Sequence, residues 1–278
     1  MDTYNSVSQS ASQALTKAYS TSFGIAIKLL PRAMRRHIYN IYGLVRLADE
    51  IVDTYRGADM LELLNDLEHE TYISTTRQYS PNLIVNSFAL SAKKFGIDKQ
   101  IVEPFFASMR MDVDKTGAYS KTQYQKYIHG SAEVVGLMCL RVFCNGDDKH
   151  YYELLPYAQS LGAAFQKVNF LRDIKQDVSE LHRSYFPGVN LSRITEEQKD
   201  QIIADIKKDF KNAHIGLLKL PRKVRPAVMT AYNYYLALLN KIESSPVEKL
   251  LSERIRIPDH SKISLLVTTM VKENFRRV

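Results

Sequence analysis

Helical periodicity runs through almost the whole chain, and it constrains the fold more than any other feature of the sequence. Apolar residues recur three and four positions apart, which places them on one face of a helix. Alternating strand patterns, hairpin signals and β-α-β spacing are absent. No short repeat or low-complexity linker divides the chain, so we expect one all-α domain over residues 1–278. The predicted helices cover residues 31–57, 59–73, 81–95, 97–113, 122–144, 151–181, 195–218, 226–243 and 263–274.

Several helix ends are marked by residues that favour starting or stopping a helix. Pro31 suits a first helical turn, and Gly96 is expected to end the helix before it. Thr195 and Gln198 have the spacing of a capping box, in which each side chain satisfies a backbone amide at the start of a helix.

No segment predicts export or membrane insertion. The start, MDTYNSVSQS, lacks the basic and apolar regions of a signal peptide. The longest apolar runs, such as ISLLVTTMV, are shorter than the roughly 18 residues of a spanning helix. Cys139 and Cys144 lie in an apolar stretch without a CxxC motif, which is typical of reduced core thiols. We therefore expect a cytoplasmic protein.

The chain is basic, with a formal net charge of +8. This charge is compatible with nucleic acid, an anionic membrane surface or a strongly anionic small substrate. Composition leaves all three partner classes open.

One face of the helix after Pro31 carries polar side chains where a buried helix would carry apolar ones. Tyr42, Arg46, Asp49 and Asp53 are spaced four, three and four residues apart. A solvated face with an Arg–Asp pair explains this stripe equally well, because carboxylate pairs at this spacing also arise by chance. The first stripe alone therefore does not establish a site.

A second polar stripe lies in SLGAAFQKVNFLRDIKQD, with Arg172 beside it. Its positions follow the same helical spacing: Gly162, Gln166, Asn169, Asp173 and Asp177. Apolar residues cover the other faces, so much of this helix is expected to be buried, and buried carboxylates need partners. Two acidic stripes that face each other are best compensated by divalent cations between them.

The expected metal is Mg²⁺, because all the candidate ligands are oxygens and no Cys/His cluster is present. Such ions would reverse the local charge and allow a diphosphate to bind. Arg46 and Arg172, together with Lys28 and Arg32, would complete a diphosphate clamp. No P-loop or GxGxxG motif competes for this role.

These residues belong to blocks through which the chain, from about Leu15 to its end, resembles the squalene/phytoene synthase family of head-to-head prenyl transferases. The resemblance implies a single-domain isoprenoid-synthase helical bundle with a central cavity between two acidic helices, where two prenyl diphosphates bind with Mg²⁺. The blocks are YSTSFGIAIKLLP, IYGLVRLADEIVD, YIHGSAEVVGLM, LGAAFQKVNFLRDIKQD, RSYFPG and SERIRIP.

The resemblance also assigns roles to single residues. The implied magnesium ligands are Asp49, Asp53, Asn169, Asp173 and Asp177. The implied catalytic residues are Asp49, Asp53, Asp173, Asp177 and Tyr127. The implied substrate contacts are Tyr19, Ser20, Thr21, Ser22, Tyr42, Arg46, Gln166, Arg172, Tyr235 and Arg254, the spacing between the last two differing from the family pattern.

The implied reaction loses diphosphate, forms a cyclopropyl intermediate, and rearranges to a linear product after a second ionisation. Carbocations need protection from water and are stabilised by aromatic faces; the candidates are Phe23, Tyr42, Tyr127 and Phe165. FLRDIKQD and RIRIP look most like bacterial carotenoid enzymes, so the expected product is phytoene from two geranylgeranyl diphosphates, without NADPH. The alternative is dehydrosqualene or squalene from farnesyl diphosphate.

Two positions depart from the family pattern. Glu50 follows Asp49 where many members have a second Asp, and Glu133 occupies a place usually held by Gly. A non-catalytic assembly factor is an alternative from another class, but in such relatives the acidic motifs have decayed. A nucleic-acid binder has no reader motif to support it. Peripheral membrane contact is expected because the product is insoluble.

Overall fold

The computed structural model describes residues 1–113, 117–179, 183–258 and 268–269. Its described part is a bundle of α-helices with one short parallel strand pair, β1 (Gly117–Ala118) and β2 (Arg183–Ser184). The helices are α1 (Asp2–Tyr19), α2 (Thr21–Lys28), α3 (Arg32–Asp53), α4 (Met60–Arg77), α5 (Leu83–Phe95), α6 (Lys99–Val113), α7 (Lys121–Ile128), η1 (His129–Glu133), α8 (Val134–Cys144), α9 (Asp148–Arg172), α10 (Ile174–Ser179), η2 (Leu191–Arg193), α11 (Glu196–Lys219), α12 (Arg225–Glu243) and α13 (Val247–Ser252).

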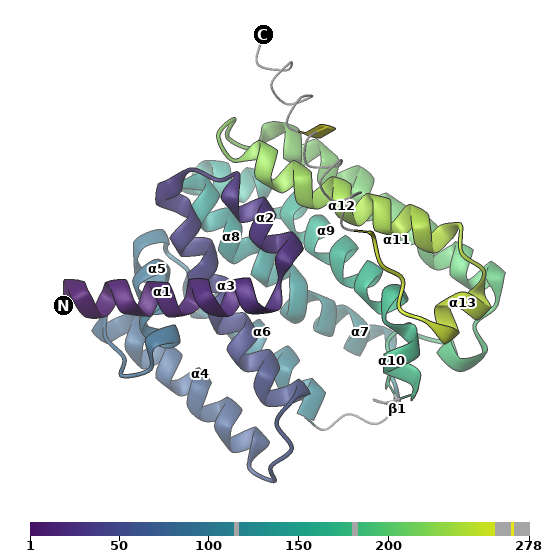
Figure 1. The fold of residues 1–278 in the computed structure, drawn as a ribbon, viewed down its shortest axis with the longest axis horizontal. Coiled ribbons are helices and arrows are strands. Elements are labelled where there is room, and N and C mark those ends of the chain that lie inside the picture. The colour runs from purple at the N-terminus through teal and green to yellow at the C-terminus, as the bar shows by residue number, and fades with distance from the viewer. Residues whose placement is uncertain (114–116, 180–182, 259–267, 270–278) are drawn as a thin grey trace.

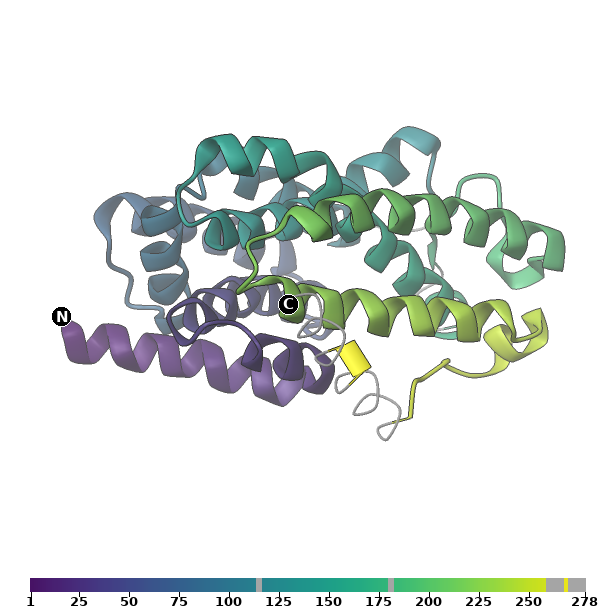
Figure 2. The same cartoon turned by 90° about the horizontal axis from the view of Figure 1, so that it is seen from above.

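The two halves of the chain occupy opposite sides of the bundle. Helices α1, α3, α4, α5 and α6 pack together on one side, and α9, α11 and α12 pack together on the other (Figure 1). The turned view shows α11 and α12 lying side by side (Figure 2). Helix α8 joins the two sides, because it contacts α3 and α6 as well as α9.

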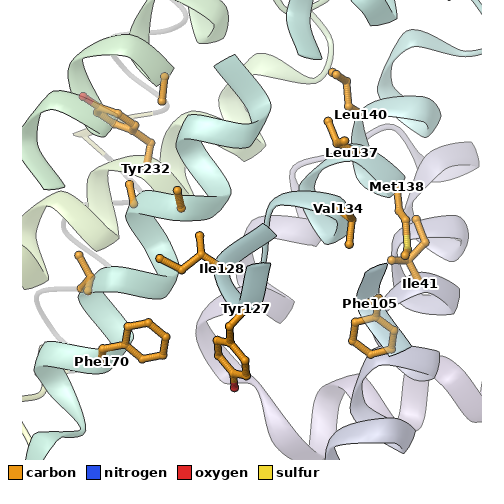
Figure 3. Packing of buried hydrophobic residues seen from close by; sticks show 14 of the residues in the cluster. Ile41, Phe105, Tyr127, Ile128, Val134, Leu137, Met138, Leu140, Phe170 and Tyr232 are labelled. Carbon is orange, nitrogen blue, oxygen red and sulfur yellow. The ribbon is translucent and has the colours of Figure 1, made fainter. Parts of the chain in front are cut away.

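The core between these helices is built from large apolar side chains. Phe105 of α6, Ile41 of α3 and Met138 of α8 are almost completely buried and lie together (Figure 3). Burying such side chains supplies most of the driving force for folding. The expected all-α class is therefore confirmed, and the core fixes the positions of the two helices that carry the polar stripes.

The local start and stop signals act as the sequence predicts. Thr195 and Gln198 form a capping box, and α5 ends at Gly96, which has a φ of 66°. Ser20 separates α1 from α2 with an extended backbone, and its side chain accepts a hydrogen bond from the Phe23 amide at 3.3 Å. The hydroxyl of Ser20 thus satisfies an amide that α2 leaves free at its start.

Two predicted helices are interrupted. The helix expected over residues 151–181 breaks at Asp173, which leaves the helical region with φ −103° and ψ 12°. The helix expected over residues 122–144 contains the π-helical turn η1. The helix predicted over residues 263–274 lies outside the described residues, except for 268–269. Residues 2–19 and 21–28 form helices that the pattern of the sequence did not single out.

The π-helical turn lies where three segments approach closely. A Cβ on Gly130 would be 2.2 Å from the carbonyl oxygen of Pro104 in α6. A Cβ on Gly162 of α9 would be 2.7 Å from the carbonyl oxygen of Ala132. Glycines at both positions therefore allow η1 to fit between α6 and α9.

Among the described residues, one helical stretch, Lys121–Cys144, is long and apolar enough to span a membrane by length and composition. Half of it is buried against the rest of the protein, and buried core helices pass the same criterion. A search of the sequence for uninterrupted apolar runs misses this stretch, because scattered polar residues divide it.

Candidate active site

A cavity of about 500 Å³ lies between α2, α3, α8, α9, α11 and α12. Helix α9 runs along it from Leu154 to Arg172, about 27 Å at the helical rise of 1.5 Å per residue. The lining residues of α9 are apolar or aromatic up to Phe165 and then become polar at Gln166, Asn169 and Arg172. The cavity therefore has one apolar end and one polar end.

Tyr42 brings the first stripe to the polar part of the cavity. Its ring centroid lies 5.4 Å from that of Phe23, and its hydroxyl forms a hydrogen bond with Ser20. All three side chains line the cavity. Burial of the phenol raises the pKa of Tyr42, so this side chain remains a neutral donor near pH 7.

Arg46 lies one turn further along α3 and compensates the acids beside it. Its Nη1 is 4.0 Å from Oδ2 of Asp49, and its Nη2 pairs with Glu50. The guanidinium also covers the ring of Tyr19, with 4.1 Å between Cζ and the ring centroid. The buried Nε of Arg46 has no hydrogen-bond partner among the described residues, so the guanidinium retains a donor for an anion.

The carboxylates around Asp49 are crowded. Burial, followed by the charges of Asp53 and Asp112, raises the pKa of Asp49 to about 7, although Arg46 opposes this effect. Like charges gathered in this way are stabilised by a cation. Within the described residues, however, no three His, Cys, Asp or Glu side chains converge as a preformed metal centre. The oxygen donors fit a hard divalent ion that also uses water or phosphate oxygens as ligands.

The second stripe presents an amide and an ion-pair cluster where α9 ends. Oδ1 of Asn169 accepts a hydrogen bond of 3.3 Å from the Tyr235 hydroxyl. Asp173 lies between two guanidiniums: its Oδ2 is 2.5 Å from Nη2 of Arg172, and its Oδ1 is 2.7 Å from Nε of Arg254. Because the helix breaks at Asp173, its carboxylate is beside the last cavity-lining residue of α9.

Stacked aromatic rings line the wall between the polar and apolar parts. The rings of Phe165 and Tyr235 are 4.0 Å apart and nearly parallel, at 15°. Burial raises the pKa of Tyr235. Two aromatic pairs, this one and that of Phe23 with Tyr42, thus present π-faces to the cavity.

Tyr127 is not among the residues that line the cavity. It is buried in an aromatic cluster with Tyr119, Tyr185 and Phe170, and Figure 3 shows it next to Phe170. Its hydroxyl donates a 2.8 Å hydrogen bond to Asp112. Burial and the Asp112 charge raise the pKa of Tyr127 well above its usual value. Tyr127 is thus connected to Asp49 through Asp112, a residue that the sequence patterns did not identify.

Lys28 and Arg32 are not among the residues that line the cavity. Arg32 begins α3, ten residues before Tyr42 and so about 15 Å from it along the helix. Lys28 ends α2, next to the loop that contains the cavity-lining Leu30. The expectation that these two cations complete the diphosphate clamp stays a prediction.

Glu133 has a structural explanation. Its Oε2 lies 2.8 Å from Nδ1 of His129 and 3.4 Å from Nε2 of Gln159, so it connects η1 to α9. It is not a cavity-lining residue.

The structure thus places the predicted residues in different positions relative to the cavity. Those that line the cavity are Ser20, Phe23, Tyr42, Gly162, Phe165, Gln166, Asn169, Arg172 and Tyr235. Those joined to its polar end by ion pairs or ring contacts are Tyr19, Arg46, Asp49, Asp173 and Arg254. Asp53 lies close enough for its charge to act on Asp49. The side chains of Thr21, Ser22 and Asp177 lie outside what the structure describes.

Known structures share this architecture. A crystal structure of a dehydrosqualene synthase in complex with ligand superposes with a TM-score of 0.83 over 99% of this chain and 98% of that chain. Its sequence identity is 18%, so the likeness establishes the fold.

Sequence comparison adds more specific relatives. The 4,4'-diapophytoene synthase of Staphylococcus haemolyticus is 28% identical over 195 residues, which are 69% of this chain and 66% of that protein. The phytoene synthase of Arthrospira platensis is 25% identical over 277 residues, 91% of this chain and 89% of that protein. The family model for squalene/phytoene synthase matches residues 16–260. With both polar stripes inside that match, this chain belongs to the squalene/phytoene synthase family.

Proposed function

We propose that this protein condenses two geranylgeranyl diphosphates head-to-head to form phytoene. Family membership indicates a prenyltransferase-type enzyme. The observation that carries the proposal is the cavity whose lining changes from apolar to polar along α9. A prenyl diphosphate has the same two parts, an apolar chain and a multiply charged head, and would bind with its head beside Arg172.

Ionisation of an allylic diphosphate requires stabilisation of the leaving group. Arg172 lines the cavity. Arg46 and Arg254 form ion pairs with acids next to the cavity. Guanidiniums bind diphosphate oxygens in a bidentate manner, and the unpartnered Nε of Arg46 adds a donor. Tyr42, Gln166 and Asn169 would orient the bound head through hydrogen bonds.

Magnesium is part of this proposal. The residues that would hold it are Asp49, Asp53, Asn169, Asp173 and Asp177. Their oxygens are the ligands that Mg²⁺ prefers, and the raised pKa of Asp49 indicates that Arg46 alone does not compensate the local negative charge. When bound, Mg²⁺ neutralises the charge that develops on the leaving diphosphate.

The rest of the cavity would protect the carbocations that follow ionisation. Its apolar lining excludes water, which would otherwise capture the cation. The stacked pair of Phe165 and Tyr235 presents π-electrons to positive charge, as does Tyr42. The cyclopropyl intermediate would remain in the cavity, held by its remaining diphosphate.

The assignment of phytoene draws on the Arthrospira platensis relative, which aligns over nearly the whole chain. A second candidate is dehydrosqualene from two farnesyl diphosphates, because the Staphylococcus haemolyticus relative is 28% identical. We further propose that the reaction needs no NADPH and takes place in the cytoplasm, on small-molecule substrates and without nucleic acid.

Release of diphosphate tests the proposal directly. The protein incubated with geranylgeranyl diphosphate and Mg²⁺ should release diphosphate, and EDTA should abolish the release. Asp173→Asn should abolish it as well, while Asp200→Asn, an exposed acid on α11, should retain it. Circular dichroism would confirm that both variants are folded. Undiminished release by Asp173→Asn, or in EDTA, would refute the proposed chemistry.

A further inference from the structure

The C-terminal end of α11 and the loop after it form one of the strongly basic segments of the chain. Residues 207–225 contain seven Lys or Arg residues and one acid, whereas the whole chain has a net charge of +8. This segment spans the last turns of α11 and the loop to α12, which lies at the edge of the bundle (Figure 1). We call its exposed face the α11 end surface: Lys208, Lys211, Ile215, Leu218, Arg222 and Lys223.

Two apolar side chains project from the α11 end surface. Ile215 is 47% exposed and Leu218 is 42% exposed, and their spacing of three residues puts them on one helix face. Tyr152 of α9 is 62% exposed. Its helix turn is tied to the end of α11 by the ion pair of Glu153 with Lys219, at 2.9 Å. Basic and apolar groups thus meet on one surface.

The cations of this surface are free to bind an external anion. Among the described residues, Lys208, Lys211, Arg222 and Lys223 form no ion pair, and all four are exposed. The acids at the start of α9 are already compensated by cations of their own: Asp148 pairs with Arg141, and Glu153 pairs with Lys219.

A second pair of exposed apolar residues has the opposite electrostatic setting. Leu61 and Leu63 of α4 are 39% and 37% exposed, and Asp59, Glu62 and Asp66 are their neighbours in sequence. An anionic partner would be repelled there and attracted to the α11 end surface. Charge therefore distinguishes two apolar patches of similar exposure.

We propose that the α11 end surface docks on an anionic lipid bilayer. Helix α11 would lie in the plane of the membrane, with Ile215 and Leu218 inserted at the boundary of headgroups and acyl chains. The unpaired lysines and arginines would lie among the lipid phosphates. Exposed aliphatic side chains favour a bilayer over a nucleic acid, whose phosphate backbone offers no apolar layer for them.

Docking there would connect the cavity to the membrane. On the last turns of α11, Ala213, Gly216 and Leu217 line the apolar end of the cavity, while Ile215 and Leu218 point to the other side of the same helix. If the proposed function is right, the insoluble product leaves a cavity whose apolar end is one helix away from the bilayer. The lipid contact itself does not depend on that function.

Vesicle co-sedimentation with the full-length protein tests the proposal. The protein should sediment with phosphatidylcholine vesicles that contain phosphatidylglycerol, remain in solution with pure phosphatidylcholine, and dissociate in high salt. The double variant Ile215→Ser/Leu218→Ser should reduce the partition coefficient at least about tenfold, since two buried aliphatic side chains are lost. Lys211→Gln/Arg222→Gln should reduce it by a similar factor.

The control is Leu61→Ser/Leu63→Ser, which removes an equally exposed apolar pair and should bind vesicles as the unchanged protein does. Thermal melts would establish that all variants are folded. Equal partition coefficients for the α11 variants and the control would overturn the proposal. It would also be overturned if the protein failed to bind vesicles but shifted duplex DNA in a gel in a way that depends on Arg222. None of these readouts needs turnover, so a failure here is distinct from a failure of the proposed reaction.

Discussion

At the scale of single residues, the polar end of the cavity is a set of charges that compensate one another incompletely. Asp173 is matched by two guanidiniums, whereas Asp49 faces two further carboxylates and one arginine. The first arrangement pairs a carboxylate with two cations beside the polar end of the cavity, and the second leaves room for a cation. The proposed reaction would use both kinds of group to stabilise the departing diphosphate.

A substitution of Tyr127 tests whether a residue outside the cavity affects turnover through its neighbour Asp112. Its hydroxyl holds Asp112, whose charge acts on Asp49. We expect Tyr127→Phe to reduce turnover at least about tenfold, or about 1.4 kcal/mol of transition-state stabilisation. Steady-state kinetics on diphosphate release would measure this loss.

The matched control for Tyr127 is Tyr119, whose ring lies 5.4 Å away in the same aromatic cluster. Tyr119→Phe should change turnover by less than Tyr127→Phe, because the 2.8 Å hydrogen bond to Asp112 comes from the hydroxyl of Tyr127. Equal losses in the two variants would show that the cluster contributes only packing.

His37 predicts a pH dependence of stability. Burial, with Lys94 and Arg36 nearby, lowers the pKa of His37 to about 4. Its Nε2 accepts from Nε of Arg36 at 3.3 Å, and its Nδ1 lies 2.9 Å from Oγ of Ser91, so the folded protein holds the neutral ring. In the unfolded chain the pKa is near 6.5, so this stabilisation is complete above about pH 6.5 and is lost progressively as the pH falls toward 4.

Urea unfolding between pH 7 and pH 5 checks this prediction. The His37 contribution should lower the unfolding free energy by up to about 2 kcal/mol at pH 5. His37→Gln should be less stable at pH 7 but should lose less on acidification than the unchanged protein. Parallel pH curves for the two proteins would contradict the assignment.

At the scale of elements, the break at Asp173 and the π-helical turn η1 shape the site. The sequence predicts both regions as continuous helices, because periodicity reports which side chains face inward and not where backbone hydrogen bonds change partner. Residues 172–175 contain neither Gly nor Pro, so the sequence carries no signal there that the helix ends. The break is instead stabilised by the ion pairs of Asp173 with residues far apart in sequence, such as Arg254.

Close packing around η1 predicts a cost for adding a single methyl group. A Cβ on Gly130 would overlap the carbonyl oxygen of Pro104, a backbone atom that has little freedom to move. We expect Gly130→Ala to lower the unfolding free energy by about 1–3 kcal/mol. Chemical denaturation monitored by circular dichroism would measure it.

Gly24 is the control for Gly130. It lies in α2, and a Cβ there would meet no atom within 4 Å. Gly24→Ala should therefore leave stability unchanged or raise it by up to about 1 kcal/mol, because alanine favours a helix. A similar loss in both variants would mean that contact with Pro104 is not the cause.

At the scale of the whole molecule, much of the fold and part of the site follow from the sequence. The all-α class and most helix boundaries are confirmed, because apolar spacing and caps act locally. Tyr42 and Arg172, on separate helices, do line one cavity. The role of Asp112 and the position of Tyr127 depend on how distant helices pack, which a spacing rule does not contain.

The net charge also takes on a more specific meaning at this scale. The α11 end surface carries exposed cations, while the proposed reaction takes place beside acids at the other end of the cavity. A charge summed over the chain does not distinguish these two regions. Their separation along the cavity would allow one molecule to bind diphosphates and lipids in different places, as proposed.

The mass of the reaction product tests the central claim most directly. The protein would be incubated with geranylgeranyl diphosphate or with farnesyl diphosphate, in the presence of Mg²⁺, with and without NADPH, and the extracted hydrocarbon analysed by mass spectrometry. We predict phytoene from geranylgeranyl diphosphate as the main product, with no requirement for NADPH. A main product made from two farnesyl units would contradict the phytoene assignment, and the absence of any coupled product would contradict head-to-head condensation itself.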